Sequence, residues 1–405
     1  MVEKTKDSIK VAYILHYFPV LSETFVFDEI IWLKKTGVDI KIFAFDSRQF
    51  PLMHREGKEL AEETNYAVNP KAGIGSFSRV LWENFLFFLS SPVKFIRYFC
   101  GYFFKIGKKE FSQIFFLGAL IKKYKPDYLH AHFAYLSAAS AMIISDFIKV
   151  PFIVTVHARD MFVANSYLED VLRRAKYVIV KSDYNKKYIM NKYSWLSADK
   201  VKTIPCGVDA GQFIPGEKLA RSGTEIISVG RLVEKKGFTY LIKACKILQQ
   251  KGLEFKCEIY GDGPLKDELL SEIKNLGLSQ AVFLRGVISR DELINVLKRS
   301  DIFVLPSIVD SQGDTEAMPV VLKEAMAAAR AVVASDAAGI PELIDSGETG
   351  ILVPSKNEKA LAEAIIVLAG DKNMQLRLGR NAREKIIRDF TLSKSAETIK
   401  VLFVE

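Results

Sequence analysis

The stretch EIISVGRLVEKKGFTYLIKACKILQ, residues 225–249, decides the fold class of this chain. Its β-branched run at 225–229 predicts a strand, Gly230 and Gly237 permit a tight turn, and the apolar residues of 239–249 recur with the period of a helix. A strand that leads through a short turn into a helix is the repeating unit of a parallel sheet. This region is therefore predicted to be α/β.

The same alternation of strand and helix continues in both directions. The strands expected in the first half are 11–15, 39–44, 127–129, 152–156, 177–181 and 201–204, and those in the second half are 225–229, 255–260, 282–285, 302–305, 331–334 and 351–353. Turn-forming residues cluster at 205–216, so two Rossmann-like, doubly wound domains are expected to face each other across a cleft. We place an N-terminal domain at 1–210, a C-terminal domain at 211–385, and a C-terminal helix at 386–405, for which packing on the N-terminal domain is one option.

Length and composition bound the class of protein. A chain of 405 residues has room for two domains, and 49% hydrophobic with 26% charged residues is typical of an ordered globular protein. The four cysteines, Cys100, Cys206, Cys245 and Cys257, match neither a disulfide framework nor a paired zinc-ligand spacing. The apolar stretch 11–15 is too short for a signal-peptide core, and no apolar run reaches the ~18 residues of a spanning helix. We expect a cytoplasmic protein.

The net charge of +9 is concentrated in one segment. Ten basic and two acidic residues lie between Lys71 and Lys125, interleaved with aromatic side chains from Phe77 to Phe116. A basic surface spread over the chain would indicate nucleic acid, whereas this segment indicates another anionic partner. A helix or helical hairpin at about 75–120 in the headgroup region of an anionic membrane explains both rings and charge, and predicts a protein peripheral on the inner face of the cell membrane. Packing of the rings into the N-terminal domain or a dimer interface is the alternative.

Two cations follow the first strand of the second half. Arg231 leaves directly from the strand end, and Lys236 stands beside the flexible Gly237. A guanidinium offers a fixed fork to phosphate oxygens and an ammonium offers a movable charge, so both can reach one anion. A solvated basic loop beside Glu234 is the alternative interpretation.

A second informative turn, 306–319, follows the strand 302–305. Pro319 is expected as the first residue of the next helix, with Glu316 just before that helix and Glu324 more than one turn inside it. The backbone donors around Met318 and Val320, together with the positive helix end, favour a phosphate between the two carboxylates. The carboxylates themselves would accept hydrogen bonds from ribose or sugar hydroxyls. Taken singly, each glutamate is equally an ordinary surface charge.

With these residues in place, the chain resembles the family 4 retaining glycosyltransferases, nucleotide-sugar enzymes of the GT-B fold. The motifs that carry the resemblance are Glu316 and Glu324 with seven residues between them, Gly230-Arg231 with Lys236-Gly237, Gly261-Asp262-Gly263-Pro264, and Gly339-Ile340-Pro341-Glu342. The segments Phe18-Pro19-Val20-Leu21-Ser22-Glu23-Thr24-Phe25 and Asp314-Thr315-Glu316 are similar to the branch that builds colanic acid, capsules and other exopolysaccharides.

The resemblance implies a role for each matching residue. Arg231 and Lys236 would bind the donor diphosphate beside Gly230 and the helix start at Met318, Pro319 and Val320. Glu324 would bind the ribose, and Glu316 the transferred sugar. Gly263 and Pro264 would lie near the nucleotide, and the backbone at Gly286 and Val287 would contact the base. The resemblance implies neither a metal nor a cofactor besides the donor substrate.

Three positions depart from the family pattern. Ala317 replaces the glycine usual after the first glutamate, and Cys206 stands where asparagine is frequent. Ser22-Glu23-Thr24 takes the place of the glycine pair that many members use beside the diphosphate. The last departure leaves the N-terminal side of the donor site open.

Four histidines lie at or just after strand ends in the first half. The resemblance implies that His157 approaches the sugar ring, while a capped structural histidine is the alternative. His130 and His132 flank Ala131 with a spacing that suits a metal pair, but no carboxylate or third ligand lies nearby in sequence. We interpret one or both as lining the acceptor side, and His16 receives no role beyond lining the cleft.

The sequence thus predicts a hexosyltransferase that moves a sugar, with retention and without metal, from a nucleoside-diphosphate sugar to a lipid-linked saccharide in surface polysaccharide biosynthesis. A sugar-nucleotide epimerase of the same fold and a non-catalytic membrane-docking assembly protein are the alternatives. Nothing in the sequence selects the base, the sugar, the acceptor, the linkage or the oligomeric state.

Overall fold

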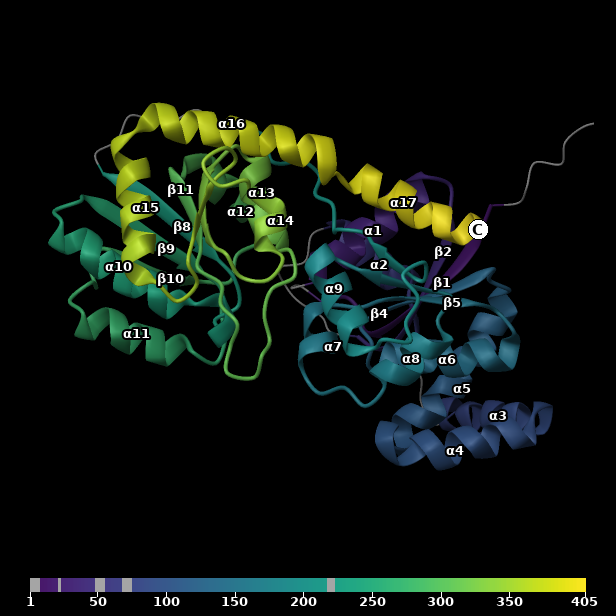
Figure 1. The fold of residues 1–405 in the computed structure, drawn as a ribbon. Coiled ribbons are helices and arrows are strands. Elements are labelled where there is room, and N and C mark those ends of the chain that lie inside the picture. Colours follow the sequence, from purple (N-terminus) through teal and green to yellow (C-terminus); the bar gives the residue numbers. More distant parts are fainter. Residues whose placement is uncertain (1–7, 21–22, 48–54, 68–74, 217–222) are drawn as a thin grey trace, which may run out of the picture. The chain divides into compact units, whose positions relative to one another are not determined.

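In a computed structural model of the chain, the structure describes residues 8–20, 23–47, 55–67, 75–216 and 223–405. The chain divides into two compact units (Figure 1). The N-terminal unit holds Met1–Val180, Tyr188–Ile204 and Ala396–Glu405, and the C-terminal unit holds Lys181–Lys187 and Pro205–Ser395. The chain changes unit at Pro205, where the turn-forming residues begin.

The N-terminal unit is built on a seven-stranded sheet whose strand pairs are all parallel. Its order is β3-β2-β1-β4-β5-β6-β7. The strands are β1 (Lys10–Tyr17), β2 (Asp39–Asp46), β3 (Asn65–Tyr66), β4 (Tyr128–His132), β5 (Phe152–Thr155), β6 (Tyr177–Val180) and β7 (Val201–Thr203). The strand order reverses between β1 and β4, and the carboxyl ends on either side of such a reversal are where open α/β sheets bind ligands.

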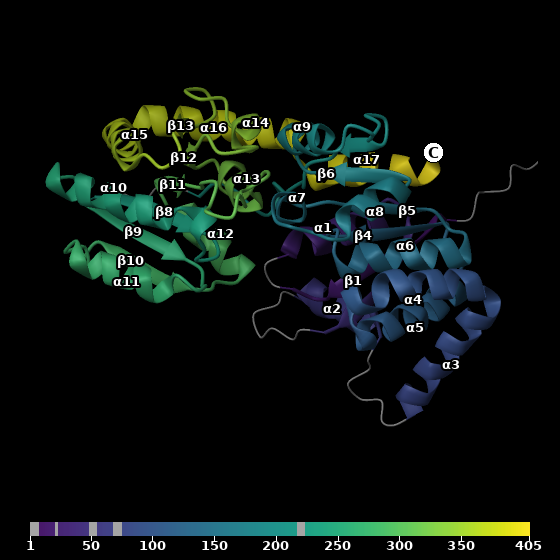
Figure 2. The same cartoon turned by 60° about the horizontal axis from the view of Figure 1, so that its bottom comes forward.

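Helices cover both faces of this sheet (Figure 2). They are α1 (Thr24–Lys35), α2 (Arg55–Glu63), α3 (Gly75–Ser90), α4 (Pro92–Ile106), α5 (Lys108–Tyr124), α6 (Leu136–Ile148), α7 (Ala158–Phe162), α8 (Leu168–Arg174), α9 (Asp183–Lys192) and α17 (Leu392–Val404). On one face, Phe115 of α5 and Ile144 of α6 belong to one apolar core, while on the other, Ile30 of α1 and Phe403 of α17 belong to a second. The chain end is therefore part of the N-terminal core.

The basic aromatic segment forms three helices, α3, α4 and α5. Helix α5 packs on α6, and its Phe111 and Phe115 are buried in the core. Helices α3 and α4 lie outside α5 in both cartoon views (Figures 1 and 2). Among the described helices, none has the length and apolar character that crossing a bilayer requires.

The C-terminal unit repeats the architecture with a six-stranded parallel sheet. Its order is β10-β9-β8-β11-β12-β13, with the reversal between β8 and β11. The strands are β8 (Thr224–Val229), β9 (Phe255–Tyr260), β10 (Val282–Gly286), β11 (Ile302–Leu305), β12 (Ala331–Ser335) and β13 (Ile351–Val353). Apolar cores that include Ile226 on one face and Phe303 on the other sandwich this sheet.

The helices of this unit follow its strands, as right-handed βαβ crossovers require. They are α10 (Phe238–Gln250), α11 (Lys266–Asn275), α12 (Arg290–Arg299), α13 (Val320–Ala327), α14 (Ile340–Leu343), α15 (Glu358–Gly370) and α16 (Lys372–Asp389), with a short 3₁₀ turn at Glu234–Lys236. The first residues of α9 join this unit because Glu342 of α14 accepts hydrogen bonds from the backbone N–H groups of Asp183 at 2.8 Å and Tyr184 at 2.6 Å.

The α/β class and all twelve expected strands are confirmed, with ends shifted by no more than three residues. Strand β3 was not expected, because two residues carry no usable periodicity. The expectation that Pro319 opens the helix is wrong by one position: Pro319 is the N-cap, with ψ at 126°, and Val320 is the first helical residue. The segment 386–405 is not one helix, since α16 ends at Asp389 and α17 begins at Leu392.

Candidate active site

The reversal point of the C-terminal sheet brings two loops together. The loop after β8 carries Gly230, Arg231 and the 3₁₀ turn, and the loop after β11 runs from Pro306 to Pro319. The backbone N–H of Ile308 donates to the carbonyl of Lys235 at 2.8 Å, and Glu234 accepts from the hydroxyl of Ser311 at 2.7 Å. Glu234 therefore links the two loops by a hydrogen bond. This contact argues against the alternative in which the basic loop after β8 is merely solvated.

Glycine is required where these loops touch. Gly237 has φ of +66°, and a Cβ there would lie 1.9 Å from the carbonyl oxygen of Pro306. A Cβ at Gly230 would lie 3.1 Å from the aliphatic stem of Lys236. The Lys236 side chain thus runs over the strand end, and only small residues leave room for it.

Lysines and carboxylates alternate between the two loops. The Nζ atom of Lys236 lies 3.0 Å from Oε1 of Glu316, and the Nζ atom of Lys235 lies 3.0 Å from Oδ2 of Asp314 and 4.0 Å from Glu316. Burial acts to raise the pKa of Glu316, but the charges of Lys236 and Lys235 and the hydrogen bond from Lys236 outweigh it and lower the pKa below its usual value. Glu316 is therefore an anion held by two ammonium groups at neutral pH.

Arg231 and the glycine-containing loops after β9 and β10 lie at the carboxyl ends of their strands. The side chain of Arg231 is exposed at the carboxyl end of β8. A Cβ at Gly263 would lie 2.5 Å from the carbonyl of Leu232, so the loop that also contains Pro264 is pressed against the turn after β8. Gly286 has φ of +76° and accepts a hydrogen bond from the N–H of Gly261 at 2.8 Å, and Val287 beside it is exposed.

Helix α13 supplies the remaining site residues from the C-terminal unit. Met318 is buried just before the Pro319 cap, and the first free N–H groups begin at Val320. Glu324 lies in the second turn with a side chain that is 7% exposed, which excludes an ordinary surface charge. Glutamate side chains are rarely buried to this extent in folded proteins unless they are paired.

Sequence reasoning missed Lys323, the neighbour of Glu324. Lys323 is fully buried in α13, and its ammonium donates to the backbone carbonyl of Cys206. Burial, with a smaller contribution from the charge of Lys181, lowers the pKa of Lys323 to about 8, although Cys206 and Glu324 act in the opposite direction. A lysine inside an alanine-rich helix was the available signal.

The N-terminal sheet presents histidines at the carboxyl ends of β4 and β5. Nε2 of His132 lies 2.8 Å from Oε1 of Glu29, Nδ1 of His132 lies 3.4 Å from Nε2 of His157, and Nε2 of His130 lies 2.9 Å from Oγ1 of Thr155. His130 and His132 are fully buried, so the interpretation that they line an acceptor surface is wrong. His16 is partly exposed and stacks on Tyr17 with ring centroids 4.0 Å apart.

Glu29 is the carboxylate that the sequence did not reveal. It comes from α1, 103 residues before His132, and its side chain is 7% exposed. Ligand atoms of Glu29, His130 and His132 all lie within 4.8 Å of one another. Nε2 of His132 and Oε1 of Glu29 lie at direct hydrogen-bond distance, 2.8 Å. Ser22, expected near the diphosphate, lies outside the described residues.

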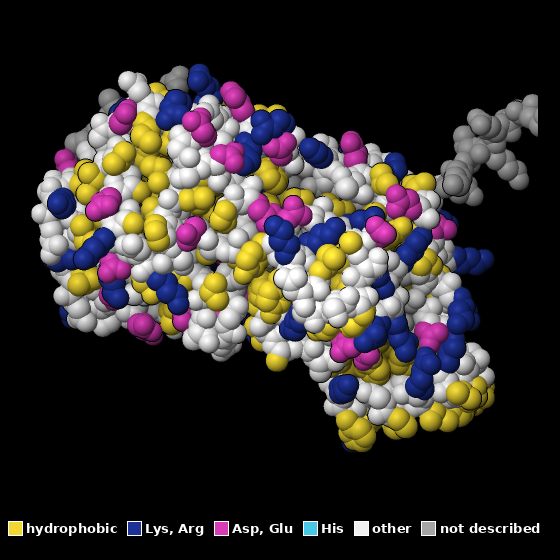
Figure 3. Space-filling view, viewed as in Figure 1, with side chains coloured by type: hydrophobic (Ala, Val, Ile, Leu, Met, Phe, Trp, Pro, Cys, Tyr) yellow, Lys and Arg dark blue, Asp and Glu magenta, His cyan; other side chains and the backbone are white. Residues whose placement is uncertain are grey.

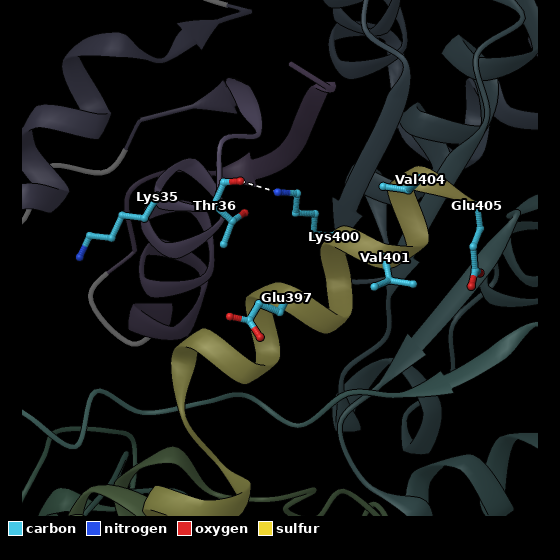
Figure 4. Close-up of a pocket in the computed structure, with 7 residues that line it drawn as sticks. All are labelled: Lys35, Thr36, Glu397, Lys400, Val401, Val404 and Glu405. Carbon is cyan, nitrogen blue, oxygen red and sulfur yellow. Dashed lines mark hydrogen bonds between the residues drawn. The ribbon is translucent and has the colours of Figure 1, made fainter. Parts of the chain in front are cut away.

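A surface pocket of the N-terminal unit lies away from these strand ends (Figure 4). Its lining comes from the end of α1 and from α17, where the ammonium of Lys400 donates to the carbonyl of Thr36. Thr36 precedes β2, so this pocket is at the amino edge of the sheet. We assign no part of the site to it.

Two family models match nearly the whole chain. The model described as Glycosyltransferase Family 4 matches residues 22–212, and the model described as Glycosyl transferases group 1 matches residues 213–385. The chain therefore belongs to the family 4 glycosyltransferases, with the GT-B type of fold.

Individual relatives narrow the comparison. An amylovoran biosynthesis glycosyltransferase of Erwinia amylovora is 28% identical over 94% of this chain and 96% of its own length. A glycosyltransferase assigned to colanic acid biosynthesis in Escherichia coli K12 is 37% identical over 47% of this chain, and the chain spans about half, 48%, of that relative. A UDP-Gal:α-D-GlcNAc-diphosphoundecaprenol α-1,3-galactosyltransferase of E. coli is 26% identical over 73% of this chain and 80% of its own.

A solved structure supports the fold across both units. The crystal structure of Anabaena HepE in complex with UDP and glucose superposes with a TM-score of 0.71 at 17% identity, covering 98% of this chain and 99% of that one. This likeness extends the GT-B assignment to the whole described chain.

Proposed function

We propose that this chain transfers a sugar from a nucleoside-diphosphate sugar to a hydroxyl of a lipid-linked saccharide in surface polysaccharide biosynthesis, with retention at the anomeric carbon and without a metal ion. The observation that carries the proposal is the pairing of Lys236 with Glu316 at the reversal point of the C-terminal sheet. One bond joins the anomeric carbon to the diphosphate, so the group that binds phosphate and the group that binds sugar must be neighbours. The 3.0 Å separation of these two side chains meets that requirement.

The residues of this site act on the leaving group. As the bond between the anomeric carbon and the phosphate oxygen breaks, negative charge grows on the diphosphate, and Arg231, Lys236 and the N–H groups at the start of α13 stabilise it. The acceptor oxygen bonds to the anomeric carbon from the same face, and its proton passes to the departing phosphate oxygen. In this account the cationic side chains take the part that a divalent ion plays in other transferases. Glu324 binds the ribose.

The names of relatives support the acceptor class. The E. coli galactosyltransferase is named for an acceptor attached to diphosphoundecaprenol, and the Erwinia relative for amylovoran biosynthesis. By analogy we expect a saccharide on a lipid diphosphate as the acceptor. His157, at the end of β5 in the N-terminal unit, is assigned to the transferred sugar.

The test is a screen of UDP-, GDP- and ADP-sugars for thermal stabilisation, followed by product analysis with a lipid-linked acceptor. The proposal expects one donor class to raise the melting temperature, and a product one sugar longer with the donor's anomeric configuration in the presence of EDTA. A converted sugar from donor alone would indicate an epimerase. The absence of stabilisation by any nucleotide would indicate a non-catalytic role, and loss of transfer in EDTA would refute metal independence.

We further propose that the outer surface of α3 and α4 contacts the membrane that carries this acceptor. Large apolar side chains are exposed along these two helices, and we call them the α3–α4 apolar edge. They are Leu81, Trp82, Phe85, Leu86, Leu89, Val93, Ile96, Phe99 and Phe104. Figure 3 shows hydrophobic side chains gathered at this end of the N-terminal unit, with basic side chains next to them. A contiguous apolar surface of this kind marks a protein or membrane contact.

The position of the charges refines the expectation from sequence. Lys94 and Arg97 lie 3.2 Å and 2.6 Å from the carboxylate of Asp146, so these cations are used inside the unit. Exposed Lys105, Lys108 and Lys109 follow the exposed Phe104 in sequence and flank the edge. Insertion of apolar side chains therefore supplies most of the binding, and fewer lysines than the composition suggested face anionic lipid.

Vesicle sedimentation tests this contact. Replacing Val93 and Phe104, which are 81% and 85% exposed, by serine should weaken binding to vesicles that contain phosphatidylglycerol by about tenfold or more, because each apolar side chain contributes ~1.5–3 kcal/mol when buried. Leu376→Ser, at a position in the C-terminal unit that is 56% exposed, should have no effect. Equal binding by both variants would refute the proposal, and a wild-type dimer that Val93→Ser and Phe104→Ser dissociate would reassign the edge to a second copy.

A further inference from the structure

A chain of hydrogen-bonding side chains runs through the N-terminal unit to His157. The hydroxyl of Tyr13 donates to Oε1 of Glu29 at 2.9 Å, and Nε2 of His132 donates to the same oxygen at 2.8 Å. Nδ1 of His132 faces Nε2 of His157 at 3.4 Å. Tyr13 and His132 are fully buried, Glu29 is nearly so, and His157 is partly exposed at the carboxyl edge of the sheet. We call these four residues the Glu29 chain.

The carboxylate determines which nitrogen of His132 carries a proton. A carboxylate can only accept, so the nitrogen that faces Glu29 is the protonated one. In neutral His132, Nδ1 is then left with a lone pair. The tautomer of a buried imidazole is set by the hydrogen bond that its other nitrogen makes, so Glu29 fixes His132 as an acceptor toward His157.

The lone pair on Nδ1 of His132 in turn determines which nitrogen of His157 carries a proton. Nε2 of His157 can be satisfied by His132 only if it carries the proton, which leaves the lone pair of neutral His157 on Nδ1. The two rings lie within 29° of parallel with centroids 5.6 Å apart. The hydrogen bonds that link Glu29, His132 and His157 are therefore consistent with one ring orientation and one tautomer of His157.

Two aromatic side chains hold the His157 ring in this plane. Phe133 stacks on it with centroids 4.2 Å apart, and Phe25 packs at 5.1 Å. Phe133 has φ of +67°, a left-handed conformation that is unfavourable for a non-glycine residue. The surrounding structure thus maintains a strained backbone at the residue that covers His157.

We propose that Glu29 and His132 are positioning residues that fix the ring plane and the proton location of His157. This inference rests on the proposed function, which assigns His157 to the transferred sugar. Neither residue touches the substrate in this account. Their contribution is to present His157 in one protonation form, so that no reorganisation is needed when the sugar binds.

Nitrogen-15 NMR of histidine-labelled protein tests the inference directly. The chain has only five histidines, so single replacements assign every imidazole signal. In wild-type protein at a pH where the rings are neutral, we expect the protonated nitrogen of His157 to be Nε2. His132→Phe keeps the ring packing and removes the acceptor, and Glu29→Leu removes the carboxylate, so both variants should give a mixture of tautomers at His157.

Two further variants separate positioning from simple support. Glu29→Gln retains an oxygen acceptor and should keep the wild-type tautomer, as a conservative rescue of Glu29→Leu. Glu62→Gln, on the exposed surface of α2, is the matched control and should change nothing. In turnover assays, His132→Phe should lower kcat by about tenfold while the donor KM stays nearly constant, since the chain acts on orientation rather than on binding.

The outcomes are distinguishable from failure of the proposed function. If no nucleotide sugar is bound or transferred, the transferase proposal fails while the tautomer measurement remains valid. Protonation of His157 at Nδ1 in the wild type, or a tautomer that Glu29→Leu and His132→Phe leave unchanged, would overturn the inference. Stoichiometric zinc in the purified protein would also overturn it, because the cluster would then be a metal site.

Discussion

The two sheets share one topology but differ in the chemistry of their carboxyl edges. At the reversal between β1 and β4, buried histidines are fixed by hydrogen bonds to Glu29 and Thr155. At the reversal between β8 and β11, long cationic side chains lie over glycine-rich turns. The same scaffold thus supports a buried polar edge in one unit and an edge of paired lysines and carboxylates in the other.

The difference shows how each edge meets its expected ligand. A diphosphate is a large delocalised charge, and movable ammonium groups can follow it as charge shifts during transfer. A sugar hydroxyl requires a donor or acceptor at a defined place, which a locked imidazole provides. Gly237 and Gly261 let backbone segments approach closely at the edge of the C-terminal sheet.

The largest expected effect is the loss of a cation from the C-terminal edge. Arg231→Ala and Lys236→Ala should each lower turnover by at least tenfold, and by ~10²–10³ if the group acts fully on the leaving diphosphate. Initial rates with the matched donor and acceptor provide the measurement. Lys251→Ala, at an exposed position after α10, should retain wild-type turnover.

Folding must be intact for this result to bear on the mechanism. Lys236→Ala leaves Glu316 with Lys235 at 4.0 Å as its remaining ammonium neighbour among those described, so its melting temperature should be recorded alongside the rate. Unchanged turnover in a folded Arg231 and Lys236 double variant would remove these two cations from the mechanism.

A second prediction concerns the close approach at Gly237. Gly237→Ala should lower the free energy of unfolding by ~1–3 kcal/mol more than Gly252→Ala, measured by urea denaturation. Both glycines have positive φ, at +66° and +74°, but a Cβ at 237 would meet Pro306 at 1.9 Å while a Cβ at 252 meets nothing within 4 Å. Comparing the two variants therefore separates the effect of backbone strain from that of the steric clash. Equal losses of unfolding free energy would mean that the loops move apart without an energetic penalty.

A third prediction concerns the buried lysine of the same edge. The pKa of folded Lys323 is about 8, below its ordinary 10.5, so the unfolded chain binds more protons between these values and stability rises with pH in that window. Relative to Lys323→Met, wild-type protein should gain about 1–2 kcal/mol between pH 8 and pH 10, measured by denaturant titration at each pH. A constant difference across this range would show that Lys323 titrates normally.

The sequence predicted local features well and long-range pairings poorly. All twelve expected strands are present, and most of them have β-branched or aromatic residues of their own. Lys236 and Glu316 could be associated because parallel strands end at one edge of a sheet. Glu29 could not be associated with His132, since 103 residues separate them and a glutamate in an amphipathic helix carries no sign of burial. The aromatic segment 75–120 likewise divides between core and surface, which composition alone cannot show.

Nucleoside-diphosphate binding tests the central claim most directly, because it isolates the C-terminal edge from the transfer step. Calorimetry with UDP, GDP and ADP should identify one ligand whose affinity falls at least tenfold in the Arg231→Ala, Lys236→Ala double variant. His157→Ala should leave that affinity nearly unchanged, because His157 is assigned to the sugar. Undiminished affinity in the double variant, or no affinity for any of the three in wild-type protein, would contradict the account.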